Sequence, residues 1–249
     1  MPANGIDYGS ENPQLGDCDT ETLVTQTQSR VWKALKRLHE YDTSFEDGKG
    51  YLLNHASSKV RLIIMFVDLV GSTNMSMTLP VDKLVTIIRA FSYEVTSVIQ
   101  SHGGYVLKYV GDAVIAFFPS SSDRLVACKN SVKCARSILN VIKNGINPIL
   151  NQYDYPELSV KIGIDEGENV VVLYGQNKIS LVDILGYCIS ITSKITSITE
   201  ADQITVGEDV YFALDPILRK RFSEITPQVN DWKYTNRTTG NLYKLFAMS

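Results

Sequence analysis

Hydrophobic residues recur with two different periods along this chain, and the two periods alternate. Short, mostly apolar runs are typical of buried strands, while apolar residues spaced three and four apart are typical of amphipathic helices. The apolar runs predict strands over residues 60–67, 104–110, 113–118, 158–165, 169–174, 179–183 and 241–246. The helical spacing predicts helices over 80–101, 123–144 and 186–198. The chain is therefore expected to fold as a mixed α+β domain.

The order of these elements is informative in itself. Strand, helix, two strands, helix, strand is the order of the split βαβ, or ferredoxin-like, sheet. Gly111-Asp112 joins the two middle strands as a two-residue link of the hairpin kind. Asp165-Glu166-Gly167-Glu168 is predicted to be the turn between the next two strands. The predicted fold is a βαββαβ sheet with helices on one face, in which the end of the first strand lies beside the central hairpin.

The segment before the sheet has a different character. Residues 1–24 are polar and are predicted to form a mobile arm. Residues 25–41 carry apolar side chains at helical intervals, which predicts an amphipathic helix that either packs on the domain, forms a dimer or relays a signal. Residues 43–50 are predicted to be a loop. We therefore expect an N-terminal arm and helix over 1–57 and one larger domain over 58–249.

Composition narrows the class of protein. Of the 249 residues, 44% are hydrophobic and 20% charged, which is typical of a globular protein with a sizeable core. A net charge of −3 without a basic run argues against a nucleic-acid partner. The four cysteines form no CxxC pair and are predicted to be reduced thiols. The longest apolar run, Leu62 to Val67, is far below the roughly 18 residues of a membrane span, and no signal-sequence pattern is present. A cytoplasmic protein without a membrane partner is expected.

Two aspartates at the ends of apolar strands suggest the chemistry. Asp68 follows the run that begins at Leu62, and Asp112 follows Gly111 in the hairpin link. A carboxylate at the end of an apolar strand is costly unless a cation meets it. Nearby glycines allow backbone N–H groups to approach an anion. Together these features predict a divalent metal site that holds a polyphosphate.

The predicted ligands follow from the preferences of Mg²⁺, which commonly takes one or two protein carboxylates and fills its other positions with phosphates and water. The candidates are Asp68, the backbone carbonyl of Leu69 and Asp112 for the metal, and Gly71, Ser72 and Thr73 for a triphosphate. The alternative is that Asp68 only caps the following segment and that Asp112 is an ordinary turn residue.

Three segments of the chain resemble class III nucleotidyl cyclases. They are Phe66-Val67-Asp68-Leu69-Val70-Gly71-Ser72-Thr73, then His102-Gly103-Gly104-Tyr105-Val106-Leu107-Lys108-Tyr109-Val110-Gly111-Asp112, then Asp183-Ile184-Leu185-Gly186. The resemblance extends from about residue 59 to the C-terminus. Three segments in the right order and spacing form a specific signal, whereas a lone Gly-Asp turn does not.

The resemblance implies a reaction. Asp68 and Asp112 would bind two divalent cations, Mg²⁺ or Mn²⁺, of which one favours the 3′-oxygen as nucleophile and the other stabilises the leaving pyrophosphate. Lys108 would read the base and Asp183 would select adenine, because a carboxylate accepts from the N6 amine and a lysine donates to N1, a pattern that guanine reverses. The implied reaction converts ATP to 3′,5′-cyclic AMP and pyrophosphate.

The same resemblance implies a homodimer, because in such enzymes the metal aspartates and the base-reading pair of one site come from different subunits. For Lys108 and Asp183 the alternatives are a charge at the sheet edge and a helix N-cap, respectively.

Two positions depart from the family pattern. Ser190 and Lys194 stand where the family usually has an asparagine that orients the ribose and an arginine that stabilises charge on the phosphate. Lysine keeps the charge but lacks the planar fork of arginine, which predicts a slow cyclase or an altered substrate. Lys194 could also be a solvated surface charge. The family's triphosphate-binding lysine has no clean match, and Lys233 or Arg237 are its candidates. Cyclisation of a pyrimidine or guanine nucleotide, or a nucleotide-binding module with weak turnover, remain alternatives.

Overall fold

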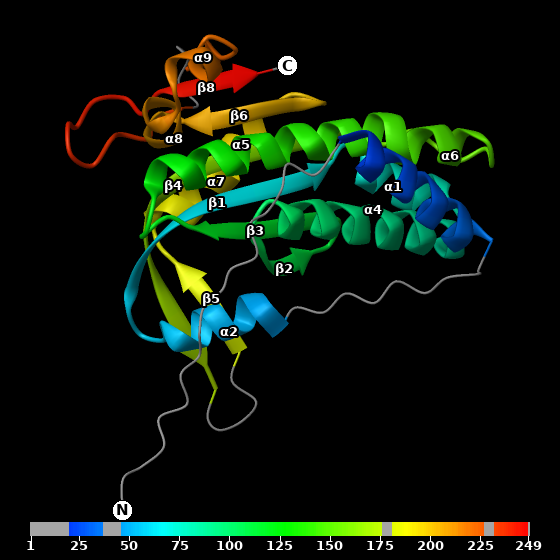
Figure 1. Cartoon of the computed structure of the whole chain (residues 1–249), viewed down its shortest axis with the longest axis horizontal. Coiled ribbons are helices and arrows are strands. Elements are labelled where there is room, and N and C mark those ends of the chain that lie inside the picture. Colours follow the sequence, from blue (N-terminus) through cyan, green and yellow to red (C-terminus); the bar gives the residue numbers. More distant parts are fainter. Residues whose placement is uncertain (1–19, 37–45, 176–180, 227–231, 249) are drawn as a thin grey trace, which may run out of the picture.

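The computed structural model describes residues 20–36, 46–175, 181–226 and 232–248 and contains the predicted βαββαβ unit (Figure 1). Its elements are β1 (Lys59–Leu69), α4 (Val81–Ser101), β2 (Tyr105–Val110), β3 (Ala113–Pro119), α5 (Arg124–Asn140) and β4 (Val160–Tyr174). The strand order begins β2-β3-β1-β4, and β1 is antiparallel to both of its neighbours. The ferredoxin-like prediction is therefore confirmed, and the helix predicted over 80–101 matches α4 to within one residue.

Four further strands extend the sheet beyond β4. Their bounds are β5 (Leu181–Leu185), β6 (Gln203–Gly207), β7 (Ser223–Glu224) and β8 (Leu245–Met248). β5 pairs with β4, β6 lies parallel to β4, and β8 lies between β6 and β7. The last predicted strand, 241–246, thus begins four residues too early, and 179–183 overlaps β5 only in part. β6 and β7 were not predicted.

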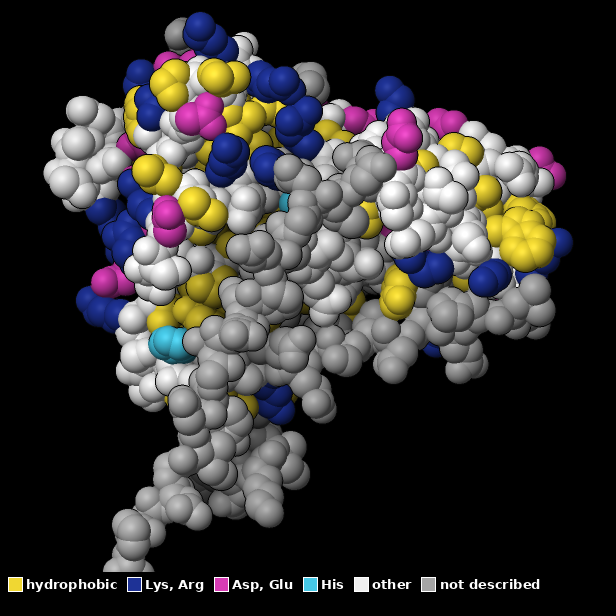
Figure 2. Space-filling model, viewed as in Figure 1, with side chains coloured by type: hydrophobic (Ala, Val, Ile, Leu, Met, Phe, Trp, Pro, Cys, Tyr) yellow, Lys and Arg dark blue, Asp and Glu magenta, His cyan; other side chains and the backbone are white. Residues whose placement is uncertain are grey.

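Two short helices, α8 (Glu208–Ala213) and α9 (Pro216–Arg219), follow β6 and were not predicted. Together with the start of α5 they expose large apolar side chains, which we call the α8 patch: Leu125, Val126, Phe212 and Ile217. Figure 2 shows hydrophobic side chains mixed with lysine and arginine in this region of the surface. Lys129 and Arg219 line a cavity of about 280 Å³ there.

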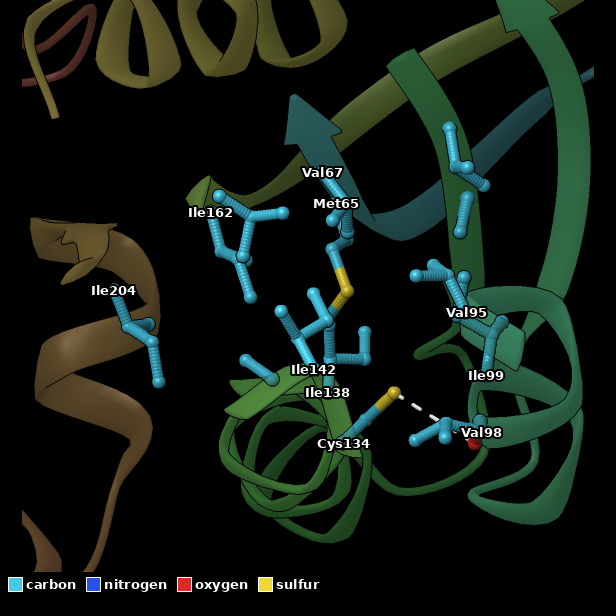
Figure 3. Packing of buried hydrophobic residues seen from close by; sticks show 14 of the residues in the cluster. Met65, Val67, Val95, Val98, Ile99, Cys134, Ile138, Ile142, Ile162 and Ile204 are labelled. Atoms are coloured by element: carbon cyan, nitrogen blue, oxygen red, sulfur yellow. Dashed lines mark hydrogen bonds between the residues drawn. The ribbon is translucent and has the colours of Figure 1, made fainter. Parts of the chain in front are cut away.

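The two faces of β1 contribute to different parts of the core. Ile63, Met65 and Val67 face α4 and α5, and Figure 3 shows Met65 and Val67 opposite Ile138 and Ile142. The alternate residues of β1, such as Leu62 and Ile64, belong to a second cluster. That cluster includes residues of α2 (Glu46–Asn54) and α7 (Tyr187–Ile198). The sheet therefore has a helix layer formed by α4 and α5, and further helices on its other face.

The turn predicted at Asp165-Glu166-Gly167-Glu168 is wrong, because β4 continues through these residues as one strand of 15 residues. Acidic residues are unfavourable in a buried strand unless they are compensated. Here Glu166 accepts hydrogen bonds from Arg61 (3.0 and 2.9 Å) and from Arg124 (2.9 Å). The charge that suggested a turn is therefore paired with cations from distant parts of the chain.

Asp165 is compensated in a different way, by a hydroxyl group. Its two carboxylate oxygens lie 2.8 and 3.0 Å from the hydroxyl of Tyr243, which is also 3.0 Å from Oδ2 of Asp209. A hydroxyl has one proton to donate. The cluster is therefore fully hydrogen-bonded only when one of the two carboxyl groups is protonated. Burial raises the pKa of Asp165 well above its ordinary value, and burial also raises the pKa of Asp209.

These raised pKa values predict a pH dependence of stability. The stabilising contribution of the cluster is fully present below the ordinary carboxyl pKa of about 4 and is lost as the pH rises through the raised values. We expect the free energy of unfolding, measured with urea, to fall over that range more steeply in the wild type than in Asp209→Asn, which keeps the shape but cannot ionise. Identical pH profiles of the two proteins would contradict this prediction.

The helix predicted over 123–144 has an unexpected end. α5 stops at Asn140, a π-helix follows over Val141–Ile146, and α6 spans Asn147–Asn151. Asp123 caps the start of α5 by accepting a hydrogen bond from the backbone N–H of Val126. A π-helical turn is rare and has no signature in the hydrophobic period, so it could not be read from the sequence.

The N-terminal amphipathic helix packs on the domain, which is the first of the predicted alternatives. α1 (Thr20–Leu35) lies against α4 and the π-helix, and Arg30 donates two hydrogen bonds to the buried carboxylate of Glu94. The mobile arm was predicted to reach residue 24, but α1 begins at Thr20. Residues 1–19 and 37–41 lie outside the described residues, so the arm before Thr20 and the end of the predicted helix remain predictions.

The loop predicted over 43–50 is wrong from residue 46 onward, where α2 begins. Gly48 is needed within this helix because α2 lies directly on β2. A Cβ atom at this position would be 2.9 Å from the carbonyl oxygen of Val106. Residues 43–45 lie outside the described residues.

Candidate active site

Asp68 and Asp112 come together at one edge of the sheet. Asp68 lies near the end of β1, and Asp112 lies in the β2–β3 turn after Gly111, which has the left-handed φ of +63°. β1 and β3 pair up to Val67 and Val114, so the strand end and the turn are neighbours. The two carboxyl groups interact electrostatically, since the charge of Asp112 raises the pKa of Asp68.

The charge of Asp68 is only partly compensated. Burial is the main cause that raises the pKa of its carboxyl group, and Asp112 adds to the effect. Lys161, whose Nζ is 3.9 Å from Oδ2 of Asp68, and a hydrogen bond from the Leu69 backbone act in the opposite direction. Lys161 faces Asp68 across the β1–β4 pair. Sequence analysis missed Lys161, because its position depends on the register of two strands that are far apart in the chain.

The donor set fits a divalent cation that also contacts a substrate. Oδ2 of Asp112 is buried and has no hydrogen-bond partner among the described residues, and an unpaired buried carboxylate oxygen is unfavourable. The described residues contain no group of three or more His, Cys, Asp or Glu side chains arranged for a metal. Two carboxylates suffice for Mg²⁺ when phosphate oxygens and water complete its shell. The pair therefore suits a cation bound together with a phosphorylated ligand.

A cavity of about 300 Å³ opens beside Asp112 and contains two of the predicted phosphate-binding residues, Ser72 and Thr73. Gly71 adopts a left-handed φ of +73° and precedes the short helix α3 (Ser72–Thr78). Ser76 also lines the cavity, although sequence reasoning missed it, and Leu84 and Ile88 of α4 form its apolar wall. The cavity thus lies on the α4 side of the hairpin. The side chain of Leu69 is buried in the core.

Lys108 and Asp183 form an ion pair on the other side of the hairpin. Nζ of Lys108 donates to Oδ2 of Asp183 at 2.5 Å. β2 and β3 change register between Val106 and Lys108, which is a β-bulge at Leu107. The bulge turns Lys108 away from the α4 face of the sheet, to which Val106 and Tyr109 belong. Lys108 can therefore reach Asp183 on β5, a strand that contacts α2 and α7. The side chains are 39% and 25% exposed, so the pair is open to a ligand.

Ser190 and Lys194 lie one turn apart on the exposed side of α7. The hydroxyl of Ser190 donates to the carbonyl of Gly186 at 3.0 Å. Within the described part of the chain, Lys194 forms no ion pair. At the start of the same helix, the guanidinium of Arg237 lies 4.4 Å from the ring centre of Tyr187. Of the two candidates near the C-terminus, Arg237 therefore contacts α7, and Lys233 is exposed without a described contact.

Comparison with known proteins decides the family. Residues 55–236 match the family model described as "Adenylate and Guanylate cyclase catalytic domain". The chain belongs to this cyclase family. The match begins close to β1 and includes both aspartates, Lys108 and Asp183.

The similar proteins and solved structures are named for different nucleotides. The chain is 24% identical over 159 residues to a cytidylate cyclase of Escherichia coli, covering 61% of this chain and 35% of the relative. It is 29% identical over 93 residues to a uridylate cyclase of Burkholderia cepacia, covering 37% and 41%. The crystal structure of the guanylyl cyclase Cya2 superposes with a TM-score of 0.66 at 21% identity, covering 77% of this chain and 92% of Cya2. The chain spans about a third of the length of the Escherichia coli relative.

Among the described residues of this cyclase, no helix has the length and apolar character needed to cross a bilayer.

Proposed function

We propose that this cyclase converts ATP to 3′,5′-cyclic AMP and pyrophosphate in a homodimer, with CTP as the second candidate substrate. The observation that carries the proposal is the ion pair of Lys108 and Asp183, which offers a donor and an acceptor side by side. Adenine presents the matching pattern, an amine donor next to a ring-nitrogen acceptor.

Cytosine has the same pattern as adenine at its N4 amine and ring N3, whereas guanine and uracil present a carbonyl in place of the amine. The pair therefore suits amino-substituted bases of either size. CTP is favoured as the second candidate by the similarity to proteins named cytidylate cyclases. The uridylate cyclase among the relatives shows that the substrate varies within these similar sequences.

The aspartate pair supplies the other half of the proposed site. Asp68 and Asp112 would hold the divalent cations, and Ser72 and Thr73 would contact the phosphates from the adjoining cavity. The cations, when bound, favour the 3′-oxygen as nucleophile and neutralise the leaving pyrophosphate. Lys194 would approach the reacting phosphate. The hydroxyl of Ser190 already donates a hydrogen bond to the carbonyl of Gly186, so it would contact the ribose either by breaking that bond or by accepting a hydrogen bond from a ribose hydroxyl.

The homodimer is proposed from the cyclase family pattern, in which the metal aspartates and the base-reading pair of one site come from different subunits. This chain carries both sets, Asp68 with Asp112 and Lys108 with Asp183. In a homodimer the aspartates of one subunit would meet the Lys108–Asp183 pair of the other, giving two equivalent sites.

A lysine at position 194 predicts a low turnover, and we expect the substitution Lys194→Arg to raise it. Lysine cannot form the bidentate contact of a guanidinium with a phosphate. Because one transition-state donor typically contributes about 10²–10³ in rate, we expect Lys194→Arg to increase kcat by roughly tenfold. Steady-state assays of both proteins measure this. Lys129→Arg, an equivalent change on an exposed face of α5, is the control. An unchanged or lower kcat in Lys194→Arg would show that Lys194 does not contact the phosphate.

The decisive experiment gives the purified chain Mg²⁺ or Mn²⁺ with each of ATP, GTP, CTP and UTP, and identifies products by mass spectrometry. Formation of cyclic AMP, cyclic CMP or both, and of no other cyclic nucleotide, would support the proposed recognition of amino-substituted bases. The relative amounts of the two products would rank ATP and CTP as substrates. Cyclic GMP or cyclic UMP as the main product would refute the base assignment but keep the metal site. Metal-dependent nucleotide binding without any product would refute turnover by this chain on its own.

A further inference from the structure

A second cavity, of about 450 Å³, lies at the side of the domain where the π-helix meets the ends of β6 and β8. Its lining shares no residue with the cavity beside Asp112. The volume is within the range of roughly 300–1,000 Å³ that is typical of small-molecule sites. Nothing in the proposed reaction uses this cavity.

The floor of this cavity is apolar. Ile142 comes from the π-helix, Leu158 from the loop before β4, Ile204 from β6 and Met248 from β8, and all four side chains are buried. Figure 3 shows Ile204 on its own element, facing the cluster that includes Ile138 and Ile142. The apolar side chains that a ligand would reach are Met248 and Leu139 of α5, which is only partly buried, and the other three pack behind them.

The acidic and basic side chains on the rim of the cavity differ in whether they have hydrogen-bond partners. The carboxylate of Asp202 accepts hydrogen bonds from Ser159 (3.0 Å) and from the backbone of Val160 (3.2 Å), and Glu157 accepts one from Asn151 (2.7 Å). The two cations of the rim, Arg136 and Lys143, are exposed, and neither forms an ion pair or a hydrogen bond with another described residue. The positive groups are therefore available to a ligand, while the negative groups are engaged within the chain.

The wall that holds Lys143 is unusual in its backbone. It is the π-helix Val141–Ile146, and π-helical turns are rare and occur frequently at functional sites. Its opposite side is closed by α1, since a Cβ atom on Gly145 would be 2.8 Å from the methyl carbon of Thr27. The wide turn is thus fixed from behind by α1 and faces the cavity with Ile142 and Lys143.

We propose that this cavity binds a small organic anion with an apolar body. The acidic group would lie between Arg136 and Lys143, and the apolar part would lie against Leu139 and Met248. A carboxylate, sulfonate or phosphate on an aromatic or short aliphatic body has the required chemistry, because two cations satisfy the anion and burial of the apolar part supplies the hydrophobic gain. The proposal is independent of the substrate of the cyclase.

The test is a fluorescence titration of the full chain with 8-anilinonaphthalene-1-sulfonate, an aromatic sulfonate whose emission increases in apolar surroundings. We expect saturable binding with a stoichiometry of one at this cavity. The double charge reversal Arg136→Glu with Lys143→Glu should weaken it about tenfold, because two attractive contacts become repulsive. Both side chains are exposed, so the fold should persist, and an unchanged near-ultraviolet circular dichroism spectrum would verify this.

The α8 patch provides the matched control, because it also combines apolar side chains with a cation on α5 (Figure 2). Lys129→Glu should leave the affinity unchanged if the cavity is the site. Weaker binding in Lys129→Glu with unchanged binding in the double variant would place the probe at the α8 patch and overturn the proposal. Absence of saturable binding to the folded wild type, or equal affinity in all three proteins, would overturn it as well.

Discussion

Asp68→Asn and Asp112→Asn are each expected to reduce cyclisation about 10³-fold or more while the protein stays folded. Each change removes one of the two carboxylates proposed to bind the cations. The bound cations would stabilise the nucleophile and the leaving group, and this stabilisation supplies a large share of the rate enhancement. The folded state should not suffer, because burial and the charge of Asp112 make the ionised form of Asp68 unfavourable. Among the described residues, Oδ2 of Asp112 also has no hydrogen-bond partner to lose. We expect thermal midpoints equal to or above that of the wild type.

The same variants have a readout that does not depend on turnover. Mn²⁺ binding, followed by electron paramagnetic resonance, should weaken in both. In the wild type, binding should also weaken as the pH falls through the raised pKa of Asp68, because the cation binds only the deprotonated carboxylate. Asp82→Asn, an exposed acidic residue in the first turn of α4, is the control and should behave as the wild type. Full activity in either Asp68→Asn or Asp112→Asn would eliminate the two-metal proposal.

Asp183→Asn is expected to abolish most of the preference for amino-substituted bases. A carboxylate accepts from an amine and repels a carbonyl, while an amide can donate or accept. Sites built around such hydrogen bonds can discriminate by about 10⁴–10⁵, so we expect the ratio of kcat/KM for ATP over GTP, and for CTP over UTP, to fall by about 10²-fold. Kinetics with the four nucleotides measure both ratios.

The stability of Asp183→Asn should change little, because the ion pair with Lys108 is partly exposed and such pairs contribute about 1 kcal/mol or less. Glu168→Gln is the matched control. It also breaks an ion pair of a strand residue, with Lys59, but at an exposed position of β4. Ratios that stay at the wild-type values in Asp183→Asn would show that this carboxylate does not read the base.

The parts of the fold that could be predicted are those determined by local pattern. α4 and the β2–β3 hairpin were predicted almost to the residue, because their periods are unbroken and the Gly111-Asp112 link is short. β4 was divided in error because the charge of Glu166 looks like a turn until Arg61 and Arg124 are placed beside it. A pairing between residues so far apart in sequence has no local signature.

The candidate site shows the same division between local and long-range information. Asp68 and Asp112 could be paired from the order of strands alone, and the structure brings them together. Lys161 could not be found, because it reaches Asp68 through the register of β1 against β4. The bulge at Leu107 was also invisible, although it decides which face Lys108 presents. Register and bulges depend on tertiary pairing.

The bulged β2–β3 hairpin has a consequence for how the two sites of the proposed homodimer would communicate. Lys108 and Asp112 are four residues apart on one short hairpin, but they would serve different nucleotides, one at each site. A nucleotide that draws Lys108 away from Asp183 would tilt the same hairpin that carries the metal ligand of the neighbouring site. In the proposed homodimer, filling one site would thus act on the metal ligand of the other, and the dimer would respond to its substrate cooperatively.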